Sequence, residues 1–164
     1  MRSVVSTAGD AHDLGRRLAG LLVPGDLVLL TGELGAGKTT LTQGLGDGLG
    51  VRGPITSPTF VIARVHPSLV GGPALVHVDA YRLGAQAELD DLDLDAEMEA
   101  AVTVVEWGAG LAESLGEDRL EISLTRSSGD SPRAEGVRDI CVRAVGPRWS
   151  SPHAHDSVAD VLWA

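Results

Sequence analysis

The chain has 164 residues, and its 23 acidic residues outnumber its 13 basic ones, so the net charge is −10 at pH 7. This length favours one domain that buries its own core, and a hydrophobic content of 43% argues against disorder through most of the chain. The single cysteine excludes an internal disulfide and a multi-cysteine metal site. The acidity and the 3% of aromatic residues argue against a protein that grips nucleic acid alone.

Neither a membrane span nor a secretion signal is visible in the sequence. No stretch approaches the roughly 18 uninterrupted apolar residues of a membrane-spanning helix. Residues 1–6 lack the apolar segment of a signal peptide. We therefore expect a cytoplasmic protein that makes no contact with a membrane.

The spacing of apolar residues predicts the elements of the first half of the chain. A helix is expected from about residue 10 to 22, and a strand buried on both faces over residues 27–30. The helix after the next glycine-rich turn has Leu41, Leu45 and Leu49 on its buried side. Strands are predicted over residues 59–65 and 75–78, with a hairpin-like connection at 67–73.

The second half is predicted in the same way. In chain order we expect an acidic, partly helical segment over 86–101, a strand over 102–105, a helix over 108–115, and strands over 120–124 and 140–145. The polar loop at 127–136 is expected to be mobile. Residues 1–149 then form a single domain, and residues 150–164 are expected to be a flexible C-terminal tail.

The strongest motif covers residues 32–39, which read G-E-L-G-A-G-K-T and match the phosphate-loop pattern G-x-x-x-x-G-K-[ST]. The glycines let backbone N–H groups surround a polyphosphate, at the positive end of the following helix. Lys38, expected to be exposed, would place its charge on the β- and γ-phosphates of ATP, and the Thr39 hydroxyl would ligate Mg²⁺. The predicted nucleotide-binding residues are Glu33, Leu34, Gly35, Ala36, Gly37, Lys38, Thr39, Thr40 and Trp107.

Strands that alternate with helices predict an α/β fold. With the phosphate loop, the expected architecture is a P-loop NTPase-like three-layer sandwich. Its sheet is expected to be mixed but mainly parallel, because the connection at 67–73 adds an antiparallel pair.

Two carboxylates end apolar runs, where a phosphate loop needs an acidic partner for Mg²⁺. Asp79 follows residues 75–78, and Glu106 follows residues 102–105. The pattern does not choose between them, and either is also explained as a helix-capping or solvated carboxylate.

The segment Ser57, Pro58, Thr59 and Phe60 lies where other phosphate-loop proteins carry a nucleotide-sensing switch. An ordinary turn explains it equally well, and core packing is the simpler explanation for Phe60. Trp107 follows Glu106 and is placed either to stack on the adenine or to pack in the core.

Four motifs in a fixed order resemble one family. They are G-x-L-G-A-G-K-T-T at 32–40, S-P-T-F at 57–60, H-x-D-x-Y-R-L at 77–83 and E-W-G at 106–108. Together they resemble the TsaE (YjeE) family of bacterial tRNA threonylcarbamoyladenosine biosynthesis ATPases, over residues 7–149. The chain departs from the family at Glu33, where Asp is usual, and at Ala11, where a small hydroxyl residue is frequent.

The resemblance implies a Mg²⁺-dependent ATPase with Lys38, Asp79 and Glu106 in catalytic roles. Thr39 and Glu106 would ligate the metal. Asp79 would be a second carboxylate, acting through water or on the attacking water. The ATPase would act as an energising or regulatory subunit with TsaD and TsaB proteins. These partners carry out the threonylcarbamoyl transfer to the adenosine next to the anticodon in tRNAs that read codons beginning with A. It would contact tRNA only through that complex. Tyr81 and Arg82 belong to the shared motif.

Two other functions remain open from the sequence. A small-molecule kinase uses the same loop, although such kinases carry several arginines in a closing lid. Between the phosphate loop and Glu106 this chain has only Arg52, Arg64 and Arg82. An adaptor that binds nucleotide without turnover is the other alternative.

Overall fold

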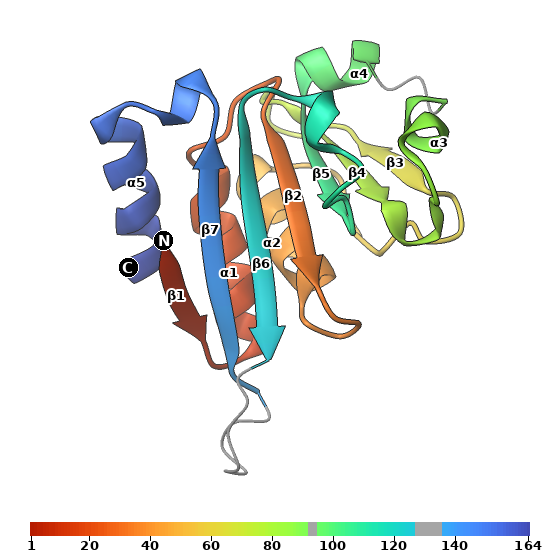
Figure 1. Ribbon diagram of the computed structural model, residues 1–164. Helices are drawn as coiled ribbons and strands as arrows, with labels where there is room; N and C mark the ends of the chain where they lie inside the picture. The colour runs from red at the N-terminus through yellow and green to blue at the C-terminus, as the bar shows by residue number, and fades with distance from the viewer. Residues whose placement is uncertain (92–94, 127–135) are drawn as a thin grey trace.

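The computed structural model describes residues 1–91, 95–126 and 136–164. Its strands are β1 (Arg2–Val5), β2 (Leu27–Gly32), β3 (Ala63–His66), β4 (Ala74–Asp79), β5 (Ala101–Glu106), β6 (Arg119–Arg126) and β7 (Arg138–Val145). Its α-helices are α1 (Ala8–Ala19), α2 (Lys38–Leu49), α3 (Gln86–Asp90), α4 (Asp95–Ala100) and α5 (Pro152–Trp163). Figure 1 shows the strands as one continuous sheet.

The sheet has the order β1-β7-β6-β2-β5-β4-β3. Its four central strands are parallel, and β1 and β7 on one side and β3 on the other join antiparallel. The mixed α/β sheet is therefore confirmed, with its parallel part at the centre. Leu30 of β2 and Asp79 of β4 both pair with Glu106 of β5, so these strands end at the same edge of the sheet.

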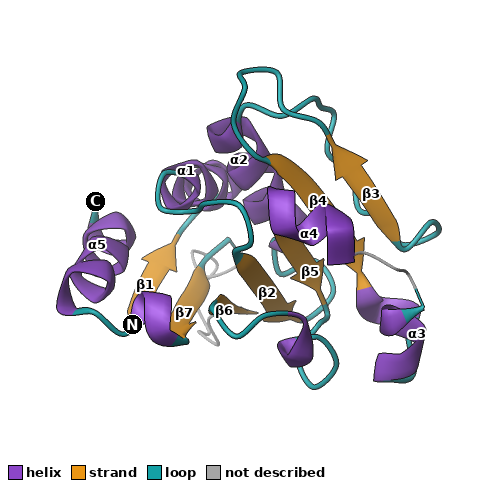
Figure 2. Ribbon diagram, turned by 90° about the horizontal axis from the view of Figure 1, so that it is seen from above, coloured by secondary structure: helices purple, strands orange, loops and turns teal. Residues whose placement is uncertain are grey.

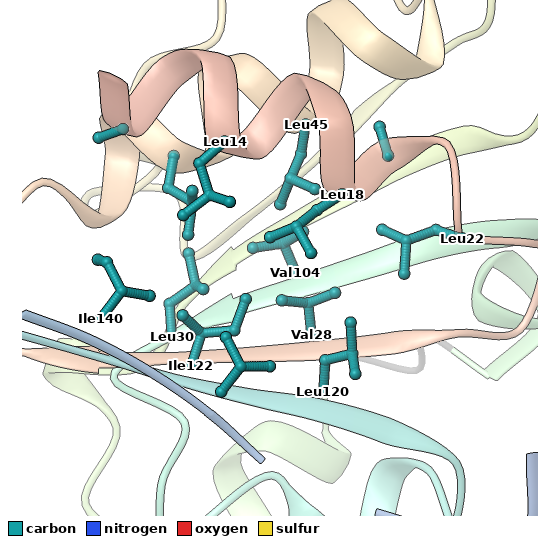
Figure 3. Close-up of a cluster of buried hydrophobic side chains, with 14 of the residues drawn as sticks. Leu14, Leu18, Leu22, Val28, Leu30, Leu45, Val104, Leu120, Ile122 and Ile140 are labelled. Atoms are coloured by element: carbon teal, nitrogen blue, oxygen red, sulfur yellow. The ribbon is translucent and has the colours of Figure 1, made fainter. Parts of the chain in front are cut away.

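Helices α1 and α2 cover one face of the sheet, where the larger core lies (Figures 2 and 3). This core combines leucines of the two helices with the alternate residues of β2, β5 and β6, such as Val28, Val104 and Ile122. Leu27 and Leu29 point to the other face, into a smaller cluster with Leu89 of α3. The sheet therefore has packed residues on both of its faces, which gives the three layers predicted from the sequence.

The glycines of α2 are explained by its close approach to α1. A Cβ atom at Gly44 would overlap the carbonyl oxygen of His12, and one at Gly48 would lie 2.5 Å from the Cβ atom of Ala19. Side chains at these positions would push the two helices apart. The glycines that weaken the helix therefore allow it to pack on its neighbour.

The segment over residues 150–164, expected to be a flexible tail, instead contains helix α5, which packs against the rest of the domain. Ser151 caps α5, with its side chain accepting a hydrogen bond from the N–H of Ala154. Val158 and Leu162 are buried, and the Ser3 hydroxyl of β1 donates to the carbonyl oxygen of Leu162 at 2.7 Å. The helix packs on α1 and β1 (Figure 1), so its partners come from the opposite end of the chain.

The structure differs from the predicted elements at three other places. Strand β1 was not predicted, because its four residues carry no clear pattern. The strand expected over 59–65 starts only at Ala63, since the chain turns at Ile62, whose φ is 68°. The helix expected over 108–115 is reduced to a 3-10 turn at Glu113–Leu115.

The hairpin-like connection is confirmed by the antiparallel pairing of β3 and β4. The loop predicted to be mobile lies outside the described residues except for Gly136, and so do residues 92–94 of the acidic segment. In the described part of the chain, no helix is long and apolar enough to cross a membrane.

Candidate functional site

The phosphate loop connects β2 to α2 in a conformation that its glycines permit. Gly32, Gly35 and Gly37 have φ angles of 148°, 75° and 105°, which residues with a Cβ atom rarely adopt. Gly37 is the N-cap residue of α2, and as a glycine it has no side chain that could cap this helix end. The first N–H groups of the helix are therefore left for a ligand, and the helix dipole favours an anionic one.

Lys38 is folded back onto its own loop. Its ammonium group donates to the carbonyl oxygens of Gly32 and Glu33, at 2.8 and 3.0 Å, and lies 3.8 Å from the ring centroid of Trp107. The side chain is 5% exposed, so the expectation of an exposed lysine was wrong. Burial lowers the pKa of Lys38, and the negative charge of Glu106 acts in the opposite direction.

Thr39, Glu106 and His77 form a partly buried chain of hydrogen bonds. The Thr39 hydroxyl donates to both carboxylate oxygens of Glu106, at 2.9 and 3.2 Å. On the other side, Nε2 of His77 lies 2.9 Å from Oε1 of Glu106. Glu106 is 3% exposed and His77 is fully buried. The carboxylate is therefore held from two sides and oriented toward the start of α2.

Asp79 connects β4 to the segment predicted as a switch. Its Oδ2 atom accepts hydrogen bonds from the hydroxyls of Ser57 and Thr59, at 2.6 and 2.5 Å, and its Oδ1 accepts the N–H of Tyr81 at 3.0 Å. Burial alone would raise the pKa of Asp79, but these hydrogen bonds outweigh it and hold the pKa below its ordinary value. Asp79 thus remains a charged acceptor.

The two candidate carboxylates lie side by side but have different partners. Asp79 and Glu106 are paired in the register of β4 and β5, yet Thr39 hydrogen-bonds to Glu106 alone. The geometry therefore distinguishes two roles that the sequence pattern left open: Glu106 adjoins the phosphate loop, and Asp79 holds Ser57 and Thr59.

A pocket of about 410 Å³ lies between these groups. Its walls are the phosphate loop, the start of α2, the hydroxyls of Ser57 and Thr59, the two carboxylates, and the rings of Tyr81 and Trp107. Pro58, Phe60 and Arg82 do not line it. Phe60 is 90% exposed, with the guanidinium carbon of Arg82 at 5.9 Å from its ring centroid, so core packing does not explain Phe60.

Trp107 has a φ of 63°, a left-handed conformation that is unusual for a bulky residue. Its backbone N–H donates to the carbonyl oxygen of Leu30 at 2.9 Å, and this bond fixes the backbone of Trp107 beside β2. Its ring lies 5.0 Å from that of Tyr81 and covers the ammonium group of Lys38. The ring therefore forms a wall of the pocket and also contacts the smaller core cluster.

Three residues at the site were given no role from the sequence. His77 is one: it begins the motif at residues 77–83, and its signal was a histidine inside the otherwise apolar run of β4. Arg126 and Arg138 are the others, and both donate to carbonyl groups of the phosphate loop. No local sequence pattern indicates a role for these arginines, because β6 and β7 come close to the phosphate loop only when the strands assemble in the order that the sheet has.

The donors near the loop fit Mg²⁺ rather than a metal held entirely by protein. Among the described residues, no group of three or more His, Cys, Asp or Glu side chains is arranged to hold a metal ion. Mg²⁺ keeps several waters and binds through one or two carboxylates together with substrate phosphates. The hydroxyl of Thr39 and the carboxylate of Glu106, joined at the pocket, provide such a partial set.

Comparison with known proteins agrees with this geometry. The family model "Threonylcarbamoyl adenosine biosynthesis protein TsaE" matches residues 5–134. The tRNA threonylcarbamoyladenosine biosynthesis protein TsaE of Streptomyces coelicolor is 63% identical over 141 residues, covering 85% of this chain and 94% of the relative. The protein of the same name from Bacillus subtilis is 37% identical over 137 residues, covering 83% of this chain and 80% of the relative.

A solved structure shows the same fold. The crystal structure of Bacillus subtilis YdiB superimposes with a TM-score of 0.74 at 29% sequence identity, covering 98% of this chain and 94% of that one. The family model covers well over half of the sequence, and the identity to the Streptomyces protein extends over most of both chains. The chain belongs to the TsaE family.

Proposed function

We propose that this protein is a Mg²⁺-dependent ATPase that takes part in the threonylcarbamoyl modification of tRNA. The observation that carries the proposal is the meeting of Thr39 and Glu106 in the pocket formed by the phosphate loop. A hydroxyl at the start of the helix and a carboxylate at the end of the neighbouring strand are the groups that phosphate-loop enzymes use for Mg²⁺. The names of the relatives supply the pathway.

Each group of the pocket has a role in this proposal. The N–H groups of the loop and the start of α2 bind the phosphates of ATP. Lys38 exchanges its bonds to Gly32 and Glu33 for bonds to phosphate oxygens. Mg²⁺, held by Thr39 and Glu106, would neutralise charge that develops on the phosphate oxygens. Asp79, charged and close to the phosphate end, orients the attacking water.

Hydrolysis by the protein alone should be slow, because among the described residues Lys38 is the only positive group that lines the pocket. In the described part of the chain no arginine lines it, and Arg82 faces Phe60 instead. An arginine supplied by a partner accelerates such reactions by roughly 10³ to 10⁵. We therefore propose that TsaD- and TsaB-type proteins complete the site, that they perform the transfer, and that tRNA is contacted only through them, in the cytoplasm.

The segment from Ser57 to Phe60 would report the state of the nucleotide to these partners. Asp79 holds the hydroxyls of Ser57 and Thr59 at the pocket, while Phe60 is exposed beside them. Loss of the γ-phosphate would change the contacts on the pocket side of this segment. Such a change in the contacts of Ser57 and Thr59 would also move Phe60, which lies on the exposed side of the same segment.

The test is ATP hydrolysis by the purified protein, alone and with TsaD, TsaB and tRNA, in the presence and absence of Mg²⁺. We expect slow Mg²⁺-dependent hydrolysis alone and strong stimulation by the partners. Lys38→Ala should lose tight ATP binding but keep the circular dichroism of the wild type. The partner complex should distinguish the ADP-loaded protein from one loaded with a non-hydrolysable ATP analogue by about 1–3 kcal/mol. Equal affinities together with fast hydrolysis alone would reject the proposal.

A further inference from the structure

Two arginines from neighbouring strands contact the phosphate loop from outside its pocket. Arg126 ends β6, and its Nη2 donates to the carbonyl oxygen of Leu34 at 3.2 Å. Arg138 begins β7, and it donates from Nε to Ala36 at 3.2 Å and from Nη2 to Gly35 at 3.5 Å. Three successive carbonyl groups thus accept from two guanidinium groups, neither of which lines the pocket.

The strand register places these arginines directly opposite one another. Arg126 pairs with Arg138 in the antiparallel ladder of β6 and β7, two positions beyond the buried pair of Leu124 and Ile140. Like charges opposite each other destabilise a sheet. The core does not require this pair, because the row of buried side chains ends before it. What the two side chains share is the phosphate loop.

The shape of the loop matches this contact. A Cβ atom at residue 35 would lie 2.9 Å from Nη2 of Arg126, and Gly35 has a φ of 75°. The general phosphate-loop pattern leaves this position free. Glycine here gives the loop its turn and leaves room for the guanidinium group.

We propose that Arg126 and Arg138 are positioning residues that hold the phosphate loop in its anion-binding form, an inference that rests on the proposed binding of ATP. A peptide group whose carbonyl oxygen is fixed by a cation has its N–H on the opposite side. For the carbonyls of Leu34 and Ala36 these are the N–H groups of Gly35 and Gly37, which are left for the anion, whereas the N–H of Ala36 closes the loop on the carbonyl oxygen of Glu33 at 3.1 Å. The hydrogen bond from the arginine also polarises the peptide, which strengthens the N–H as a donor. Two fixed positive charges behind the loop further favour the phosphates in front of it.

The test compares two ligands that share only their phosphates. Mg²⁺-ATP and Mg²⁺-tripolyphosphate are titrated into the wild type, R126M, R138M and the double variant. We expect each single substitution to weaken the binding of both ligands by about ten-fold, which is typical for the loss of a hydrogen bond to a charged group. The double variant should bind both ligands more weakly still. Arg143→Met is the matched control, because Arg143 lies on β7 but is exposed and ion-paired with Glu121; it should bind both ligands like the wild type.

Two results would overturn the inference. One is wild-type affinity for both ligands in the double variant. The other is a loss for ATP with none for tripolyphosphate, which would place the arginines on the base or sugar. Circular dichroism and thermal unfolding of every variant show that the fold is retained.

A second measurement needs no ligand. The N–H of Ala36 donates to the carbonyl oxygen of Glu33 at 3.1 Å inside the loop. Its hydrogen exchange, followed by NMR in the nucleotide-free protein, should be about ten-fold faster in the double variant, because the loop opens more often. Unchanged exchange would overturn the role of the arginines even in a protein that binds ATP. Failure of the wild type to bind ATP would instead overturn the proposed function.

Discussion

The Thr39 hydroxyl donates to both carboxylate oxygens of Glu106, across 67 residues of sequence. The contact exists because β2 and β5 are neighbours in the sheet, with Leu30 and Glu106 in register. The strand that precedes the phosphate loop and the strand that ends in Glu106 therefore deliver both groups to one point. Four predictions follow from what surrounds this contact.

Replacing Glu106 by alanine should reduce Mg²⁺-dependent turnover far more than nucleotide binding. A carboxylate that helps to hold the metal acts mainly on charge that develops in the transition state, and such losses are typically about 100-fold or more. Steady-state hydrolysis and equilibrium ATP binding measure the two effects separately. Glu117→Ala, at an exposed position, serves as the control. Unchanged hydrolysis in the Glu106 variant would transfer the metal role to Asp79.

Substitutions of His77 should separate two effects on turnover, that of its hydrogen bond to Glu106 and that of the volume of its ring. The amide nitrogen of glutamine reaches the position of Nε2, which contacts Glu106, whereas that of asparagine reaches only the position of Nδ1. We expect H77Q to retain most of the turnover and H77N to lose about ten- to hundred-fold.

The control is H66Q, since His66 is also buried but bonds to the carbonyl oxygen of Arg52. Its turnover should equal that of the wild type even where its stability falls. If H77Q and H77N hydrolyse ATP at the same rate, His77 does not orient the carboxylate.

Asp79 should stabilise the fold in a pH-dependent way. Hydrogen bonds from Ser57, Thr59 and the N–H of Tyr81 outweigh the effect of burial, so the folded-state pKa lies below that of the unfolded chain. The stabilisation is therefore complete above the unfolded-state pKa and is lost as the pH falls through the folded-state pKa. D79N should lower the free energy of unfolding by about 1–3 kcal/mol at neutral pH.

Urea unfolding from neutral pH down to about pH 2 measures this difference, because the loss begins only below the unfolded-state pKa of about 4. The gap between wild type and D79N should narrow toward acid pH. The double variant S57A/T59A removes the donors instead of the acceptor and should show the same trend. A gap that widens toward acid pH would contradict the assigned pKa direction.

The fluorescence of Trp107 should report nucleotide binding. Its ring lies 3.8 Å from the ammonium group of Lys38 and 5.0 Å from the ring of Tyr81, so movement of Lys38 to the phosphates changes its surroundings. Trp149 and Trp163 are replaced by phenylalanine to isolate the signal. Constant emission at saturating ATP, with binding shown by calorimetry, would mean that the ring only packs.

Several features of the protein are determined by the sequence alone, because their physics is local. The phosphate loop needs glycines, a lysine and a hydroxyl within eight consecutive residues, and its geometry follows from the φ angles that those glycines permit. Strands β2, β4 and β5 are mainly apolar runs, which are typical of strands buried on both faces. Asp79 and Glu106 were recognised because each ends such a run.

The tertiary structure decided what depends on distant partners. Helix α5 is held by β1 and α1, which come from the other end of the chain, so no neighbouring segment of sequence indicates its partners. Phe60 is exposed because the chain turns before β3, although its residue type favours the core. The contact of Thr39 with Glu106, the support from His77 and the arginines behind the loop all depend on strand order and register. Long-range pairing leaves no mark in a local sequence pattern, because it is fixed only when the whole sheet assembles.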